Sequence, residues 1–213
     1  MKNKRALGGL RRVNISVYFA VFIACLLVLD HTGLVVYALV CVGVHELGHI
    51  AAIRLYRAPV EEISFRLFGV GIRLRNNVRL GYRQELVVAL AGCAANLLLC
   101  AAAWICARVG FYALQASLLL VFSLMIGAFN ILPICPLDGG RALETLLSMR
   151  LPPEKVQRIV DIVSLVLIVP LATAGFRLLI WTGCNFSLLL VAVYLAAMLV
   201  LKGRRGAVVS RNK

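Results

Sequence analysis

The sequence predicts an all-α polytopic membrane protein, with about six transmembrane helices and a short membrane-associated β-hairpin after the second helix. Three observations lead to this fold class. Hydrophobic residues make up 62% of the 213 residues, whereas an ordinary soluble domain is ~45–50% apolar. The apolar residues form long runs, and a run of ~18 or more with few charges can cross a bilayer. The basic residues gather in alternate connections between these runs, as the positive-inside rule requires.

Six apolar segments are the expected membrane spans. The first follows a basic start and is expected to be retained, because no A-x-A-like cleavage site comes after it. No internal repeat or low-complexity segment divides the chain, so residues 1–213 are expected to form a single transmembrane domain. The six segments are residues 13–29, 34–55, 86–109, 113–132, 156–173 and 186–201.

The positive charge is explained by membrane topology. The net charge is +14, which in a soluble protein would suggest a nucleic-acid partner. Here the sequence lacks a basic stripe with interleaved aromatic residues, so no nucleic acid is expected. The basic residues precede the first span, follow the second, surround the connection of the fourth to the fifth, and follow the sixth. Both termini are therefore expected to be cytoplasmic, which requires an even number of spans.

The connection after the second span, residues 60–74, has the pattern of a β-hairpin. Ile63 and Phe65 alternate with polar residues before Gly69, and Val70 and Ile72 alternate with glycine and arginine after it. Period-two patterning on both sides of a glycine favours two paired strands. One apolar and one basic face would suit a hairpin on a membrane surface. The alternative is a disordered basic loop.

The second span contains the first chemical motif, His45-Glu46-Leu47-Gly48-His49. Residues four apart lie one turn apart on one helix face, so both imidazoles can reach one metal ion. Glu46 can take a proton from a water on that metal, because zinc lowers the pKa of such a water to ~7. Ionisable groups inside a membrane span are costly and usually functional. The alternative is a hydrogen-bonded polar cluster that holds helices together.

Asp138 is the candidate third ligand. Two prolines break the chain after the fourth span, and Gly139 and Gly140 then allow a close backbone approach. The competing interpretation is that Asp138 caps the helix predicted over residues 139–149. His31, the remaining histidine, is expected across the membrane from the motif and is treated as an ordinary loop residue.

The HELGH motif and Asp138 are expected at similar depths in the membrane, which is consistent with a shared site. His49 lies six residues before the cytoplasmic end of the second span at Leu55, or ~9 Å at the rise of a helix. The fourth span also runs from outside to inside, and Asp138 follows its cytoplasmic end. Both halves are therefore expected near the cytoplasmic face.

Together, the HELGH span and the segment NILPICPLDGGR of residues 130–141 resemble the site-2 protease family of intramembrane zinc proteases. The small six-span form is similar to the branch that includes the sporulation processing protease. The resemblance implies zinc ligands His45, His49 and Asp138, with Glu46 as general base. It also places Asn96 and Asn130 around the site, and no PDZ or CBS domain fits in the chain. The segment AGCAAN departs from the family's G-P-x-x-N element, because Cys93 stands where proline is usual.

The resemblance implies a zinc metalloendopeptidase that cuts a peptide bond in or next to a membrane segment. The expected partners are the lipid bilayer, a membrane-tethered protein substrate and, as a further candidate, a regulatory membrane protein. The alternative is a metal transporter or sensor that uses the same ligands without hydrolysis, for which Glu46 has no evident purpose. A structural membrane protein without activity is a third interpretation, against which the intact ligand set argues. Asn96 by itself could serve only to join helices.

Overall fold

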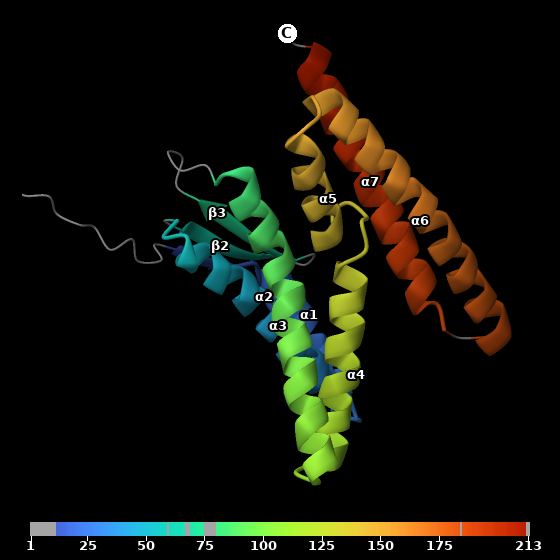
Figure 1. The fold of residues 1–213 in the computed structure, drawn as a ribbon. Helices are drawn as coiled ribbons and strands as arrows, with labels where there is room; N and C mark the ends of the chain where they lie inside the picture. The colour runs from blue at the N-terminus through green and yellow to red at the C-terminus, as the bar shows by residue number, and fades with distance from the viewer. Residues whose placement is uncertain (1–11, 59, 67–68, 75–79, 184, 212–213) are drawn as a thin grey trace, which may run out of the picture. The chain divides into compact units, whose positions relative to one another are not determined.

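The computed structural model describes residues 12–58, 60–66, 69–74, 80–183 and 185–211 (Figure 1). Contacts divide the chain into two compact units, Met1–Ala128 and Phe129–Lys213, which are described separately. The boundary falls in the last turn of helix α4 (Ala113–Asn130). The expectation of a single domain stays a prediction.

The chain is a membrane protein with several apolar helices. Among the described residues, four helices are long and apolar enough to cross a bilayer: α2 (Leu34–Leu55), α3 (Tyr82–Val109), α4 and α6 (Pro153–Thr182). Two further apolar helices are shorter, namely α1 (Val17–Leu29) and the part Ser187–Leu201 of α7 (Ser187–Arg211). The count of six spans therefore stays a prediction. Helix α6 is longer than the predicted span at residues 156–173, because Pro153 suits the first turn of a helix and the apolar sequence continues to Thr182.

The first unit begins with a small sheet whose strands lie in the order β1-β2-β3. Strand β2 (Val60–Arg66) pairs antiparallel with β3 (Gly69–Leu74) and parallel with β1 (Arg12–Ile15). Strands β2 and β3 occupy the segment of the predicted hairpin. The two residues that join them, 67–68, lie outside the described residues, so the hairpin and its membrane association stay predictions. Helix α1 begins at Val17, a few residues after the approximate start expected near residue 13, because residues 12–15 pair with β2.

The turn between α1 and α2 is held by one carboxylate. Asp30 Oδ1 accepts hydrogen bonds from the Thr32 hydroxyl at 2.6 Å and the Thr32 N–H at 2.9 Å. Its Oδ2 accepts from the Val35 N–H at 2.7 Å, in the first turn of α2. The bond from the Thr32 hydroxyl, followed by that from the Val35 N–H, lowers the pKa of Asp30 from its usual 3.8. Asp30 thus fixes where α2 begins.

Helices α2, α3 and α4 pack at positions with small side chains. A Cβ on Gly48 of α2 would lie 2.5 Å from the Ala91 carbonyl oxygen and 2.7 Å from the Ala95 Cβ, so α2 and α3 approach closely there. Helix α4 joins both of them through polar bonds. The Ser123 hydroxyl donates to the Asn96 carbonyl oxygen at 2.8 Å, and the Cys41 thiol donates to that of Leu119 at 3.7 Å.

The second unit contains α5 (Asp138–Ser148), α6 and α7. Its core is formed by buried residues of the 134–135 segment, α6 and α7, namely Ile134, Cys135, Val156, Val160, Ile168 and Leu195. Helices α6 and α7 lie side by side (Figure 1), and a Cβ on Gly175 would lie 2.7 Å from the Leu189 backbone nitrogen. The Cys135 N–H donates to the buried Ser164 hydroxyl of α6 at 2.9 Å.

Candidate metal centre

The two histidines of the HELGH motif are close together in the first unit. His45 and His49 lie one turn apart on α2 and are 4% and 7% exposed, so water reaches neither ring freely. Their Nε2 atoms are 3.2 Å apart. Two nitrogens at ~2.0–2.1 Å from one tetrahedral zinc ion would be about 3.3 Å apart. The pair is therefore spaced as two ligands of one metal ion.

The outer nitrogen of each ring contacts a fixed partner. His49 Nδ1 lies 2.7 Å from the Val88 carbonyl oxygen on α3. A carbonyl can only accept, so His49 donates through Nδ1–H and its Nε2 lone pair is left for the centre. His45 Nδ1 lies 3.3 Å from the Asn96 amide nitrogen. Such outer contacts set the tautomer and orientation of metal-binding histidines.

The fully buried amide of Asn96 fits a metal at this place. Its Oδ1 has no hydrogen-bond partner among the residues that the structure describes. When both Nε2 atoms face a metal, His45 carries its proton on Nδ1 and needs an acceptor there. A half-turn of the Asn96 amide would bring Oδ1 to that position. The donor set, with its orphaned acceptor, therefore fits zinc.

Gly92 makes room for the two rings. A Cβ at this position of α3 would collide with His49 Nε2 and would lie 2.7 Å from His45 Nε2. Glycine is thus required for the imidazoles to lie against α3. Glu46, the expected general base, is on α2 beside His45 and is half-buried.

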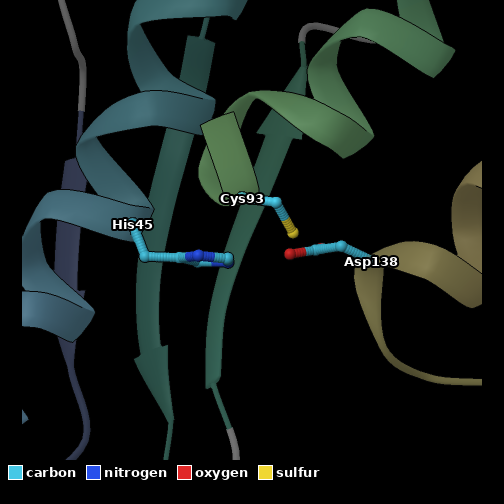
Figure 2. Close-up of side chains that lie close together, drawn as sticks. All are labelled: His45, Cys93 and Asp138. Atoms are coloured by element: carbon cyan, nitrogen blue, oxygen red, sulfur yellow. The ribbon is translucent and has the colours of Figure 1, made fainter. Parts of the chain in front are cut away.

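Cys93 is a residue near this centre that the sequence reading did not assign to it. It is 8% exposed and belongs to no disulfide. Its sulfur lies within 4.8 Å of a ring nitrogen of His45, and Figure 2 shows the two side chains extending from α3 and α2. The sequence signal was its position three residues before Asn96, on the same helix face.

Asp138 and Asn130 belong to the second unit. Asp138 is the first residue of α5 and is 8% exposed, and Figure 2 shows its side chain at that helix start. Leu137 occupies the N-cap position, so the Asp138 carboxylate belongs to the first turn. There it is favoured by the positive end of the helix dipole. Asn130 ends α4 and is half-buried.

The backbone around Asp138 is compact. A Cβ on Gly139 would collide with the Ile131 carbonyl and lie 2.5 Å from the Leu132 carbonyl oxygen. One on Gly140 would lie 2.5 Å from the Ile134 carbonyl oxygen. The two glycines therefore let α5 begin directly against the 131–134 segment, as their sequence suggested.

Comparison with known proteins points to one family. The model of Peptidase family M50 matches residues 106–171, which include Asn130 and Asp138. Stage IV sporulation protein FB of Bacillus subtilis is 28% identical over 149 residues, which are 70% of this chain and 52% of the relative. A zinc metalloprotease of Methanocaldococcus jannaschii is 30% identical over 148 residues, which are 67% of this chain and 39% of the relative. The resemblance to the site-2 protease family is confirmed.

The fold is that of a site-2 protease as well. The solved structure of the site-2 protease from Methanocaldococcus jannaschii matches with a TM-score of 0.59 and covers 94% of both chains. At 21% identity this likeness concerns the fold alone. The chain spans only 52% and 39% of the two curated relatives.

Proposed function

We propose that the protein is an intramembrane zinc metalloprotease that hydrolyses a peptide bond in or next to a membrane segment of a substrate protein. The observation that carries the proposal is the buried pair His45 and His49, whose Nε2 atoms are 3.2 Å apart while the outer nitrogens contact Val88 and Asn96. Such a pair on an apolar helix fits a metal centre, and the adjacent Glu46 adds a base.

Each residue of the proposed site has one role. His45, His49 and Asp138 would hold the zinc, and Asn96 and Asn130 would support the site and orient the substrate. Zinc supplies Lewis acidity, which polarises a peptide carbonyl and acidifies water. Glu46 would accept the proton of the attacking water and pass it to the leaving amine. Burial of the histidines restricts water at the centre. A substrate helix would therefore have to unwind for its carbonyl to be reached.

Replacement of Glu46 by glutamine tests the reaction. The Glu46→Gln variant should bind zinc as the wild type does, because the ligands remain, but it should lose cleavage. The experiment expresses this variant in the native cell and identifies the membrane proteins that accumulate uncut, with zinc content measured on purified protein. Glu85→Gln, at an exposed position of α3, is the matched control. If no uncut membrane protein accumulates in the Glu46→Gln cells, the result would favour a metal transporter or sensor.

The third ligand is tested separately. Asp138→Asn keeps the size of the side chain but removes its charge, so zinc affinity should fall. A variant with unchanged zinc affinity and cleavage would exclude Asp138 from the site.

The proposed substrates are membrane-tethered proteins, and a regulatory membrane protein is a further proposed partner.

The proposed topology has six spans with both termini cytoplasmic. In a variant without native cysteines, an impermeant thiol reagent added to intact cells should label a cysteine at Thr32. It should not label one at Arg211. Labelling at Arg211 would contradict the proposed even count.

The sheet is the proposed place where the substrate is held extended. Strand β2 is paired on both sides, whereas β3 lies at the edge of the sheet in the part of the chain that the structure describes. An edge strand can pair with an added strand through its outward N–H and C=O groups.

A proline scan from Val70 to Arg73 tests this proposal. Because successive N–H groups alternate in direction, the scan should separate loss of substrate pairing from loss of the pairing with β2. Outward positions should lose cleavage with the fold retained, and inward positions should lose the β2 pairing. Cleavage unaffected at every outward position would exclude strand addition.

A further inference from the structure

We infer that Ser164 is a positioning residue for Asp138, because its hydroxyl on α6 holds the turn that sets where α5 begins and where the Asp138 carboxylate lies. The inference deepens the proposed function and rests on it, since it takes Asp138 as a zinc ligand. The residues that carry the inference all belong to the second unit.

The turn of residues 132–137 is tied to α6 through a single peptide group. Its two prolines have no N–H to donate. The Cys135 N–H donates to Ser164 Oγ at 2.9 Å, so this bond leaves the turn and reaches α6. The other N–H groups of the turn donate to carbonyl oxygens of residues 129–134 at 2.7–3.2 Å, namely those of Leu132, Ile134 and Leu137.

The Ser164 hydroxyl is oriented to accept this bond. It donates its own proton to the Val160 carbonyl oxygen at 2.7 Å, which leaves the oxygen lone pairs for the Cys135 N–H. Ser164 is fully buried, so water does not reach the hydroxyl as a substitute acceptor. Loss of the hydroxyl would leave a buried N–H without its acceptor, and the turn would have to shift to satisfy it.

The peptide that Ser164 holds also supports the first turn of α5. A Cβ on Gly140 would lie 2.5 Å from the Ile134 carbonyl oxygen and 2.7 Å from the Cys135 nitrogen, so α5 starts in direct contact with this peptide. Asp138 is the first residue of the same turn, and Figure 2 shows its side chain at the helix start. A shift of the peptide would therefore move the carboxylate. Metal ligands must be held to within ~0.5 Å, so such a shift would weaken binding.

A double-mutant cycle tests whether Ser164 acts through Asp138. In purified full-length protein, Ser164→Ala should bind zinc ~10-fold more weakly than the wild type, as when a contact that orients a ligand is lost. In the Asp138→Asn background, where this ligand is already weakened, Ser164→Ala should cause no further loss. A purely structural role would give the same loss in both backgrounds. Competition with a chelating dye measures the zinc affinity.

Three further variants separate positioning from stability. Ser164→Thr keeps a hydroxyl that can bond to the preceding helical turn, so it should bind zinc as the wild type does, even with a lower unfolding midpoint. Ser148→Ala removes a hydroxyl that donates to the Glu144 carbonyl oxygen at 2.7 Å, and should leave zinc affinity unchanged. Gly175→Ala, about three turns further along α6, would place a Cβ 2.7 Å from the Leu189 nitrogen. It should lower the midpoint without changing zinc affinity.

The outcomes distinguish this inference from the proposed function. Unchanged zinc affinity in Ser164→Ala, or an equal loss with and without Asp138→Asn, would overturn the positioning role and leave the proposed protease intact. Equal losses in Ser164→Ala and Ser164→Thr would overturn it too, because the hydroxyl would then not matter. Failure of the wild type to bind zinc would overturn the proposed function and this inference with it.

Discussion

The close contacts at Gly92 and at Gly139 both depend on a missing Cβ, but in different ways. At Gly92 the missing Cβ leaves room for the side chains of His45 and His49. At Gly139 it leaves room for the backbone of the 131–132 segment. Side chains can rotate away from an intruding methyl group, but a packed backbone moves only with the elements that it connects. The space at Gly92 is therefore needed for the metal centre, and the space at Gly139 is needed for the packing of α5.

The largest effect should come from Gly139→Ala. The new Cβ would overlap the Ile131 carbonyl, so α5 would have to move as a whole. We expect a loss of roughly 3 kcal/mol in the free energy of unfolding, as for overpacked cores. Thermal unfolding in detergent measures it. Gly43→Ala is the control, because a Cβ there meets nothing within 4 Å. Equal midpoints for the two variants would break the comparison.

Gly92→Ala should show the opposite balance. The histidine rings would turn away from α3, so zinc affinity should fall ~10–100-fold, as when an orienting contact is lost. The unfolding midpoint should fall less than in Gly139→Ala. Zinc titration by competition with a chelating dye measures the affinity, again against Gly43→Ala. Unchanged affinity in Gly92→Ala would show that the rings do not need this space.

Asn96→Leu sharpens the comparison, because it removes the amide from the centre while keeping the branched shape of the side chain. The variant removes the group beside His45 Nδ1 together with the orphaned Oδ1. We expect zinc affinity to fall ~10–100-fold, with stability within ~1 kcal/mol of the wild type. Asn96→Asp keeps an acceptor for His45 and should retain zinc. Ser123→Ala, which removes the hydroxyl that donates to the Asn96 carbonyl but keeps the Asn96 amide, is the control. Zinc binding by Asn96→Leu at wild-type affinity would exclude the amide from the centre.

The smallest effect should come from Asp30→Ala, which loosens the start of α2 far from the rings. Because the folded pKa of Asp30 is lowered from 3.8, its stabilisation is present above that pH and is lost as the pH falls through the folded value. The difference in unfolding midpoint between wild type and Asp30→Ala should therefore be larger at pH 7 than at pH 3. Zinc affinity should stay unchanged. A midpoint difference independent of pH would mean that the charge of Asp30 does not contribute.

The sequence predicted which residues meet within one helix better than which residues meet between two helices. The four-residue spacing of His45 and His49 was sufficient to predict a shared face, because helix geometry fixes it. The position of the Cys93 sulfur within 4.8 Å of a His45 ring nitrogen depends on how α3 packs against α2, which no spacing encodes. Among the described strands, β1 escaped prediction for a similar reason: four residues next to an apolar run carry too little period-two pattern, and only their pairing with β2 makes them a strand.

That pairing of β1 with β2 carries a consequence for insertion into the membrane. Strand β1 directly precedes α1 and β2 follows α2, and Val13 pairs with Ile63 in a shared sheet. The two ends of the α1–α2 segment must therefore meet on one side of the bilayer. A chain that leaves one side of the bilayer and returns to it crosses the bilayer an even number of times, whatever the charges around it. In the proposed topology, the pairing of β1 with β2 thus requires α1 and α2 together to cross the bilayer an even number of times, and the basic residues need only select the side.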